Sequence, residues 1–311
     1  MMKIYENSDY VKNQSKQTVL AFGNFDGVHI GHCHLLNKAK KYAADNGLDF
    51  GVYTFVDSPK FRCADHSILT DLQERLSYID SHVSPDFVYL ERFDAVKDFS
   101  PEEFVDYIIG RFDVKVCFCG ESFSFGKAAS GNPETLVALM KDKCRDVVVV
   151  PTLLHDGYSV SSTRIKSLIR EGNVELAELL LGTPFGFTSK VLHGAHLGHK
   201  LGFPTVNQII PKNLVVPKYG VYSTVVIVDG REYMGVTNFG VKPTVSSDNS
   251  PVAETYIIDF DGDVYDKYVG IYFCKMLREE KKFSSLDELI ENIRINVEQT
   301  KIFFKEKHEK V

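Results

Sequence analysis

The chain is expected to be an α/β protein with two parts: a parallel-sheet domain, followed by a six-stranded antiparallel β-barrel domain with a C-terminal helix. Three observations predict this. The length of 311 residues suits two domains. Strand and helix patterns alternate in the first half, whereas strand patterns dominate the second. Hydrophobic residues make up 44% of the chain, which is enough for two packed cores. We place the boundary between residues 183 and 184.

The first half begins with an apolar run, Thr18–Phe22, that predicts a buried strand. Later in the sequence, a helical pattern places five residues on one face: Leu35, Leu36, Ala39, Tyr42 and Ala43. Asn46-Gly47 is expected to end this helix. Further strands are predicted at Phe50–Phe55, Val114–Cys119 and Val147–Val150, and helices at Asp71–Ile79, Pro101–Ile109 and Pro133–Lys141. This alternation predicts a parallel sheet covered by helices on both faces, with ligands bound beyond the carboxyl ends of the strands.

The second half is dominated by strand patterns. They cover Lys190–Leu192, Thr205–Ile210, Val221–Val228, Glu232–Asn238, Thr255–Phe260 and Val269–Met276. Asp229-Gly230 predicts a hairpin turn, and Asp261-Gly262 a similar one. Six antiparallel strands favour a closed barrel, because closure removes exposed edges. The stretch 242–251 is expected to be a mobile lid, and a capping box at Ser285 begins an amphipathic C-terminal helix.

The charge and the cysteine pattern exclude several classes of function. The formal net charge of −6 gives no global basic field for nucleic acid. No segment approaches the roughly 18–20 apolar residues of a membrane span. The polar start of the chain is not a signal peptide, so a cytoplasmic protein is expected. The six cysteines match no zinc spacing, and His32-Cys33-His34 would diverge on a helix.

The most informative segment is Gly23-Asn24-Phe25-Asp26-Gly27-Val28-His29-Ile30-Gly31-His32, a glycine-rich turn between the first strand and its helix. Free backbone N–H groups and the positive end of the helix point to one spot there, which predicts an anion site. The histidines would stabilise charge on a phosphate, and the glycines would allow the backbone to approach it. The four residues of His-x-Gly-His alone are equally typical of a turn whose histidines satisfy backbone groups.

Two later segments are candidates for the same site. The loop from Gly120 to Gly131 carries Phe123 and Phe125, which form either a platform for an aromatic ring or an ordinary surface turn. The segment Ser161-Ser162-Thr163-Arg164-Ile165-Lys166 opens a helix. Its hydroxyls are either simple N-caps or, with the nearby cations, ligands of a triphosphate.

The second half has its own glycine-rich segment, running from His193 to Asn207. Glycine recurs every four residues in this loop, at Gly194, Gly198 and Gly202. Lys200 lies before the last of these glycines, and Pro204 follows it. The backbone amides of the loop are therefore candidates for binding phosphates. Thr205 and Asn207 alternate along a strand start and offer hard oxygens to one side, which suits Mg²⁺. A glycine-rich hairpin with an ordinary polar face is the alternative interpretation.

The ten residues from Gly23 to His32 resemble the signature of the nucleotidyltransferase superfamily, and more specifically the adenylyltransferase half of prokaryotic FAD synthetase. That family shows the Gly120 loop and the Ser-Ser-Thr segment in the same order. The resemblance implies a Rossmann-like FMN adenylyltransferase domain over residues 1–183. Class I aminoacyl-tRNA synthetases share His-Ile-Gly-His, but the chain has no segment like their Lys-Met-Ser-Lys-Ser.

This resemblance implies site roles in the first half. The FMN phosphate would attack the α-phosphorus of ATP with release of pyrophosphate, aided by Mg²⁺. Phe123 and Phe125 would shape the flavin side. His29 and His32 would be catalytic through contacts with the ATP phosphates. The other binding positions are Gly23, Asn24, Phe25, Asp26, Gly31, Ser162, Thr163 and Lys166.

The second half resembles riboflavin kinase. The family's Gly-Phe-Pro-Thr-x-Asn signature stands at residues 202–207, a second motif begins at Asn238, and Glu254 opens the segment that matches its catalytic strand. The resemblance implies a riboflavin kinase domain over residues 184–311. Glu254 would be the general base toward the ribityl hydroxyl. Thr205 and Asn207 would hold Mg²⁺. Gly194, Gly198, Lys200, Gly202, Pro204 and Asn238 would bind the nucleotide or flavin.

Together the motifs predict a bifunctional riboflavin kinase/FMN adenylyltransferase that uses ATP and Mg²⁺ and handles riboflavin, FMN and FAD. Ser122, Lys166, Thr183 and His199 depart from the residues that these families usually carry there. One alternative is therefore an enzyme with one active half, the kinase. Another is a non-enzymatic flavin-binding regulatory protein. Small molecules are the expected partners, with no nucleic acid and no membrane, and weak self-association is left open.

Overall fold

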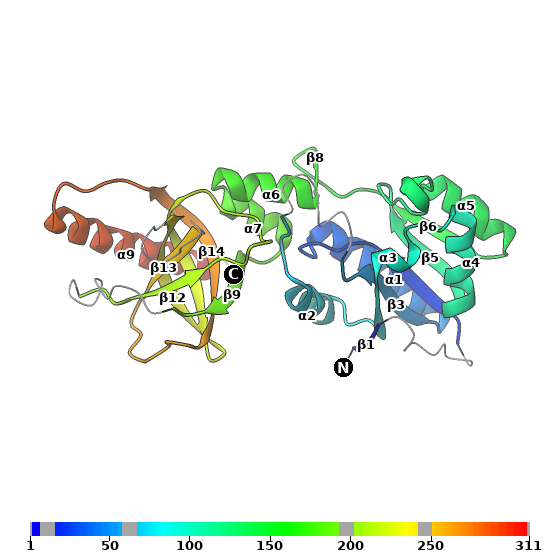
Figure 1. Cartoon of the computed structure of the whole chain (residues 1–311), viewed down its shortest axis with the longest axis horizontal. Helices are drawn as coiled ribbons and strands as arrows, with labels where there is room; N and C mark the ends of the chain where they lie inside the picture. The colour runs from blue at the N-terminus through cyan, green and yellow to red at the C-terminus, as the bar shows by residue number, and fades with distance from the viewer. Residues whose placement is uncertain (1, 7–15, 58–66, 193–201, 242–250, 310–311) are drawn as a thin grey trace. The chain divides into compact units, whose positions relative to one another are not determined.

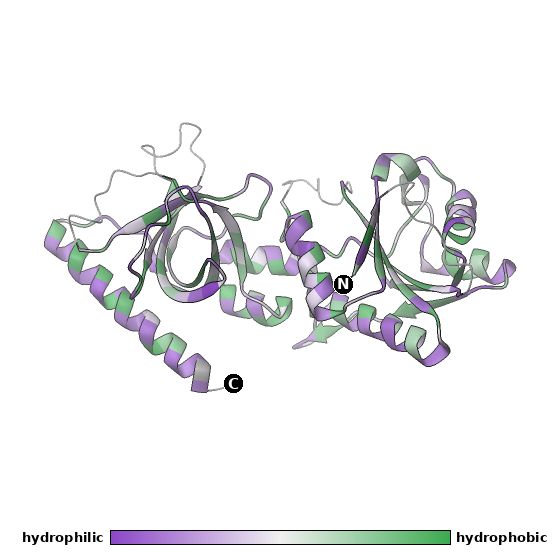
Figure 2. Ribbon diagram, turned by 90° about the horizontal axis from the view of Figure 1, so that it is seen from below, coloured by the Kyte–Doolittle hydropathy of each residue, from purple (hydrophilic) through white to green (hydrophobic). Residues whose placement is uncertain are grey.

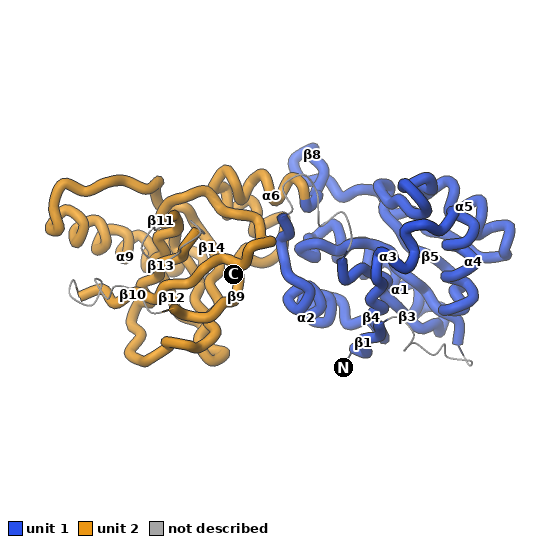
Figure 3. Tube along the Cα trace, viewed as in Figure 1, with its two compact units in different colours: residues 1–162 blue, residues 163–311 orange. Residues whose placement is uncertain are grey.

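The computed structural model describes residues 2–6, 16–57, 67–192, 202–241 and 251–309. The chain divides into two compact units, residues 1–162 and 163–311 (Figure 3). The helices just before the predicted boundary, α6 (Ser162–Glu171) and α7 (Val174–Leu181), thus group almost entirely with the second unit. The division between residues 183 and 184 stays a prediction about where the two catalytic domains meet.

The first unit is built on a parallel sheet. Among the described residues six strands pair in the order β1-β4-β3-β2-β5-β6. They are β1 (Lys3–Glu6), β2 (Thr18–Phe22), β3 (Asp49–Phe55), β4 (Phe87–Glu91), β5 (Val114–Gly120) and β6 (Asp146–Val150). All neighbours run parallel, and β2 lies in the middle with every residue buried. The carboxyl end of β2, where the Gly23–His32 turn starts, is therefore enclosed by its neighbours.

Helices cover both faces of this sheet, as the sequence predicts (Figure 1). Their bounds are α1 (Ile30–Asn46), α2 (Leu72–His82), α3 (Phe93–Val96), α4 (Pro101–Phe112) and α5 (Pro133–Asp142). Leu36 of α1 and Ile79 of α2 belong to one core cluster, and Ile108 of α4 and Leu136 of α5 belong to the other. A 3-10 turn (Lys127–Ala129) and a hairpin of β7 (Leu154–His155) and β8 (Tyr158–Ser159) complete the unit.

Local signals in the sequence determine several helix ends. Ser100 forms the full capping box with Glu103, and Pro101 occupies the first turn of α4. Gly47 ends α1 in the left-handed conformation at φ 66°. Strands β1 and β4 were not predicted from the sequence, although β4 is entirely buried between β1 and β3.

The second unit is an antiparallel sheet that curls into a barrel, which confirms the predicted fold. Within the described residues its six strands pair in the order β10-β13-β12-β11-β14-β9. They are β9 (Phe185–Lys190), β10 (Thr205–Ile209), β11 (Gly220–Val228), β12 (Arg231–Val241), β13 (Pro251–Ile257) and β14 (Tyr268–Glu279). Buried Gln208 on β10 donates hydrogen bonds of 2.7 Å to the carbonyls of Ser189 and Val269. It thereby joins the two edge strands of the sheet.

The interior of the barrel holds a chain of buried threonines. Thr237 lies between Thr224 and Thr255, with hydroxyl–hydroxyl distances of 2.9 and 2.8 Å. Each of the three buried hydroxyls thus has a hydrogen-bond partner. Outside the barrel, α9 (Leu286–Glu309) packs Val297 against Val221 and the strands beside it. Green and purple alternate along α9 in Figure 2, as expected of an amphipathic helix.

Some predicted strand bounds in the second unit are wrong. The strand expected at 190–192 is β9, which ends at Lys190, and the strand expected at 255–260 is β13, which ends at Ile257. The Asp229-Gly230 turn is as predicted, since Val228 pairs with Arg231 and both turn residues have positive φ. The expected lid lies outside the described residues except for Pro251, which begins β13.

Candidate active sites

The turn that follows β2 adopts an uncommon backbone. Phe25, Gly27 and Val28 have φ values of 50°, 80° and 41°. Such angles are rare for residues with a side chain, and rarest for a β-branched residue such as Val28. Gly23 is required here because a Cβ would lie 2.7 Å from the Phe25 ring. The turn therefore folds tightly back on itself before α1 begins.

His29 caps the first turn of α1. Its Nδ1 accepts a hydrogen bond from the backbone N–H of His32 at 3.2 Å. Burial lowers the pKa of His29 to about 4. The ring is therefore neutral near pH 7, and because Nδ1 accepts, its proton is on Nε2. A Cβ at Gly31 would meet this ring at 3.2 Å, so glycine at this position gives the ring its space.

His32 stacks on His29 with ring centroids 3.5 Å apart. Burial, and then the nearby charges of His29 and Arg75, hold the pKa of His32 well below its ordinary value. Its Nδ1 is buried and has no hydrogen-bond partner within the described part of the chain. The two histidines therefore form one neutral, closely packed pair at the start of a helix, where anions are favoured.

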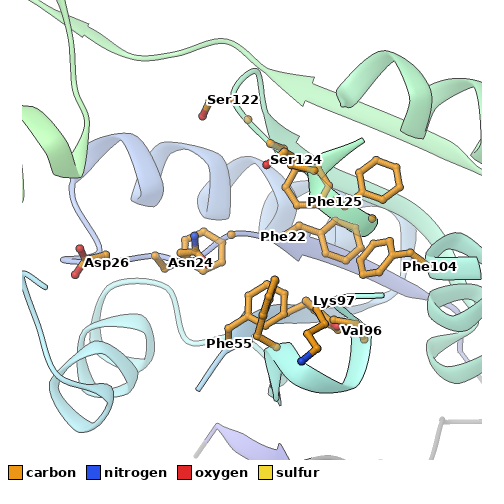
Figure 4. Close-up of a pocket in the computed structure, with 18 of the residues that line it drawn as sticks. Phe22, Asn24, Asp26, Phe55, Val96, Lys97, Phe104, Ser122, Ser124 and Phe125 are labelled. Atoms are coloured by element: carbon orange, nitrogen blue, oxygen red, sulfur yellow. The ribbon is translucent and has the colours of Figure 1, made fainter. Parts of the chain in front are cut away.

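A pocket of about 450 Å³ opens beside this turn. Figure 4 shows Phe22, Phe104 and Phe125 together on one side of it, and Asn24 and Asp26 at the other end. The predicted site residues that line it are Gly23, Asn24, Phe25, Asp26, His32, Phe123, Phe125 and Ser162. The structure thus brings together segments more than a hundred residues apart in sequence. His29 and Gly31 do not line the pocket, although His29 stacks on His32, which does.

Stacked aromatic rings form the apolar wall of the pocket. Phe123 lies between Phe22 and Phe125, with ring centroids 5.4 and 5.6 Å away. Gly131 pairs with Phe125 in an isolated bridge and has no room for a Cβ, which would lie 2.7 Å from the Phe125 ring. Such a flat apolar wall suits a planar ring system. The sequence did not single out Phe22, Tyr53, Phe55 or Phe104, although each lies on a buried strand or helix face at this end of the sheet.

The hydroxyl of Ser162 donates to the Asp26 carbonyl at 3.0 Å, which joins the third predicted segment to the first. Thr163 and Lys166 follow on α6, in the second unit. Asp26 is itself buried, and its carboxylate accepts from the Leu69 N–H at 2.7 Å. Ser162 is therefore fixed to the turn by hydrogen bonding.

Sequence reasoning missed Arg75 on α2. It is 3% exposed, and its guanidinium donates to the carbonyls of Asn24 at 2.9 Å and Phe55 at 2.7 Å. Burial lowers its pKa to about 10, so it stays charged at neutral pH. A signal was present: Arg75 shares the helix face of Leu72 and Ile79, where an apolar residue is expected.

The second unit holds another cluster of polar side chains, on the outer face of its barrel. Thr205 Oγ1 lies 3.2 Å from Glu254 Oε1. Glu254 is the cross-strand partner of Asn207 on β10 and of Asn238 on β12. Residues from three strands therefore meet on one face. Gly202 and Pro204 precede β10, whereas Gly194, Gly198, His199 and Lys200 lie outside the described residues.

This cluster offers hydroxyl, amide and carboxylate oxygens from Thr205, Asn207 and Glu254. Hard oxygen donors of this kind suit Mg²⁺, which binds few protein ligands and keeps room for phosphate oxygens. Asn207 is buried, so its amide is held in place. The donor set is therefore compatible with the predicted magnesium site.

Comparisons with known proteins match the two halves of the chain to two families. Residues 11–164 match the family model described as FAD synthetase, and residues 181–304 match the model described as riboflavin kinase. The bifunctional riboflavin kinase/FMN adenylyltransferase of Bacillus subtilis (strain 168) is 32% identical over 302 residues, covering 94% of this chain and 95% of that protein. The protein of the same description from Escherichia coli (strain K12) is 33% identical over 277 residues, with coverages of 87% and 88%.

A solved structure also resembles the whole chain. It is a crystal structure described as a macrolide-efflux protein from Streptococcus pneumoniae, with a TM-score of 0.85 and 28% sequence identity. The similarity covers 96% of this chain and 99% of that one. As a separate observation, none of the helices that the structure describes has the length and apolar character needed to cross a membrane.

The parallel-sheet unit with its histidine turn and the barrel with its Thr-Asn-Glu cluster define a two-domain transferase. The matches extend over nearly the full length of both relatives. The chain belongs to the family of bifunctional riboflavin kinase/FMN adenylyltransferases.

Proposed function

We propose that this protein phosphorylates riboflavin to FMN in its second unit and adenylylates FMN to FAD in its first, using ATP in both steps. One observation carries the proposal: each unit matches one of the two family models, and in each some of the predicted motif residues lie close together. Two separate clusters on one chain are consistent with two successive group transfers.

In the first unit, the proposed reaction is attack by a phosphate oxygen of FMN on the α-phosphorus of ATP. A new P–O–P bond forms, and the bond to pyrophosphate breaks. The histidines and the start of α1 would stabilise the charge on the phosphates, since neutral imidazole N–H groups donate without adding a buried charge. Phe123 and Phe125 would stack on the flavin ring.

Other residues of this half have proposed roles that rest on the family resemblance. Ser162, Thr163 and Lys166 would bind the ATP phosphates, with Ser162 already fixed to the turn. Ser122 lines the pocket at a position where the family usually has an acidic or amide residue. Its hydroxyl still provides a hydrogen-bond partner, so we expect the adenylylation half to be active.

In the second unit, Glu254 is proposed to accept the proton of the ribityl hydroxyl as that oxygen attacks the γ-phosphorus of ATP. The Thr205 hydroxyl holds one carboxylate oxygen by hydrogen bonding, which orients the base. Thr205 and Asn207 would bind Mg²⁺. When bound there, the ion would neutralise charge on the ATP phosphates. Gly194, Gly198, Lys200, Gly202, Pro204 and Asn238 remain proposed contacts of the substrates.

We also propose that the protein acts in the cytoplasm, where its co-substrate ATP is available. The test of function is separation of flavins by chromatography after incubation with ATP and Mg²⁺. Riboflavin and FMN are supplied in separate reactions. FAD from both substrates supports the full proposal. FMN that accumulates without FAD would leave only the kinase half. Bound flavin without any conversion would favour a regulatory protein.

A further inference from the structure

The segment Leu69–Arg75 holds the Asn24–Gly27 part of the histidine turn through three hydrogen bonds. The Leu69 N–H donates to the Asp26 carboxylate at 2.7 Å. The Thr70 hydroxyl accepts from the Gly27 N–H at 3.2 Å. Arg75 donates to the Asn24 carbonyl at 2.9 Å. We call Leu69–Arg75 the brace, because its hydrogen bonds reach three of the four residues in that stretch.

Arg75 is the residue of the brace that connects the turn to a second element of the sheet. One guanidinium nitrogen holds the turn through Asn24, and another holds the end of β3 through the Phe55 carbonyl. Burying a guanidinium costs several kcal/mol unless its hydrogen bonds and charge are compensated. Asp26 and Asp71 supply opposite charge to Arg75. A buried cation at this position is therefore costly to maintain, and a purely apolar residue would pack α2 with less penalty.

The hydrogen bond from Arg75 to the Asn24 carbonyl fixes the orientation of a peptide group that faces the pocket. The Asn24 carbonyl accepts from both Arg75 and Thr54, at 2.9 and 3.2 Å. In a trans peptide the N–H points opposite to the carbonyl, so fixing this oxygen also fixes the direction of the Phe25 N–H. Within the described residues, no hydrogen-bond acceptor contacts that N–H. Asn24 and Phe25 both line the pocket.

The turn needs such support because its backbone is strained. Left-handed φ values at Phe25 and Val28 cost of order 1–3 kcal/mol each, and they persist only when surrounding contacts impose them. Without the brace, the turn is free to relax to an ordinary conformation. Donor groups aimed at phosphate would then have to be reordered in every catalytic cycle.

We propose that Arg75 is a positioning residue for the adenylylation of FMN: by holding the Asn24 carbonyl, it keeps the strained turn and the Phe25 N–H in the arrangement that binds the reacting phosphates. This inference rests on the proposed function of the first unit. It adds a residue on α2 that does not line the pocket and acts through the turn.

The experiment measures FAD formation from FMN and ATP by the full chain carrying Arg75→Met, Arg75→Lys or Thr70→Val. The folded fraction of the first unit is measured by urea unfolding, so that kcat is expressed per folded site. Arg145→Met is the matched control. Arg145 is a half-buried arginine of the first unit, but it pairs with Asp113 at the amino end of β5, whereas the turn follows the carboxyl end of β2.

We expect Arg75→Met to lower kcat per site about thirtyfold, with the KM for ATP changed less than about threefold. Arg75→Lys keeps the charge but lacks the two-pronged geometry, so it should recover part of the loss. Thr70→Val should lower kcat about threefold. In the double variant with Arg75→Met, Thr70→Val should add little, because both contacts support one turn.

Two results would overturn the inference. One is full kcat per folded site in Arg75→Met while the folded fraction of the first unit falls, which would give Arg75 a structural role only. The other is a loss in Arg145→Met as large as that in Arg75→Met. If Arg75→Met does not fold, Arg75→Lys and Thr70→Val with unchanged kcat per site would overturn it equally. Failure of the wild-type chain to make FAD from FMN would instead reject the proposed function.

Discussion

The Thr205 hydroxyl and the Glu254 carboxylate lie 3.2 Å apart and join strands β10 and β13 on the outer face of the barrel. Replacing Glu254 by Gln keeps the size and removes the carboxylate that we propose as the base. We predict that phosphorylation of riboflavin by Glu254→Gln falls by about 100-fold or more. FAD formation from FMN should keep its wild-type rate, because that reaction uses the other unit. Separate assays with riboflavin and FMN measure this, and equal loss of both activities would contradict the assignment.

The buried state of His29 predicts a pH dependence of stability. Its pKa is about 4 in the folded chain and 6.5 ordinarily. The unfolded chain therefore takes up this proton first as the pH falls. The contribution of neutral His29 to the free energy of unfolding is complete above pH 6.5. It falls by roughly 3 kcal/mol as the pH drops toward 4.

The His29→Asn variant should lack this loss, because Asn can still cap α1 but does not titrate. Urea unfolding of the first unit, measured from pH 7 to pH 4, should therefore show a shallower decline than in the wild type. His82→Asn is the control, since His82 is an exposed residue at the end of α2. The interpretation fails if His29→Asn and His82→Asn give the same slope.

The aromatic wall predicts a selective effect on flavin binding. Phe123→Ala removes the ring that lies between Phe22 and Phe125. We expect the KM for FMN in FAD formation to rise about tenfold. The KM for riboflavin in phosphorylation should stay unchanged. Tyr158→Ala, an exposed aromatic of the same unit outside the pocket, should alter neither KM. A rise in both KM values would argue against a flavin wall here.

The threonine chain predicts a large effect of a small change. Thr237→Val has nearly the same volume but leaves the hydroxyls of Thr224 and Thr255 without their shared partner. We predict a loss of about 3 kcal/mol in the unfolding free energy of the barrel, measured by urea denaturation. Thr188→Val is the matched control, because Thr188 is exposed on strand β9. Equal urea midpoints for Thr237→Val and Thr188→Val would show that the hydrogen bonds among the three threonines do not stabilise the barrel.

Local patterns explain why much of the fold was predictable. The Thr18–Phe22 run, the Gly23–His32 turn and the helix behind it are contiguous, so periodicity and turn chemistry were sufficient. The same holds for the capping box at Ser100 and the hairpin at Asp229. In these places each local preference agrees with the global fold.

The features that were missed depend on contacts distant in sequence. Strand β4 is buried by pairing with β1 and β3, and its own residues show no distinctive period. The bounds of β9 and β13 follow the register of the barrel, which single-strand patterns do not specify. Arg75 lies 51 residues from Asn24, and only the folded chain shows that the two meet. The first pocket was predicted by its polar motifs, whereas most of its aromatic wall was not.

Helix α6 begins at Ser162, in the first unit, and continues into the second, where α7 follows it. Val174, Ala177, Leu180 and Leu181 of α7 are buried, and Glu178 pairs with Lys307 of α9 at 2.6 Å. A cut before Thr163 removes Thr163 and Lys166 from the adenylylation half. A cut after Leu181 strips an apolar helix from the barrel half. With the roles proposed for Thr163 and Lys166, separating the two activities into independent proteins requires the adenylylation half to keep α6 and the barrel half to keep α7.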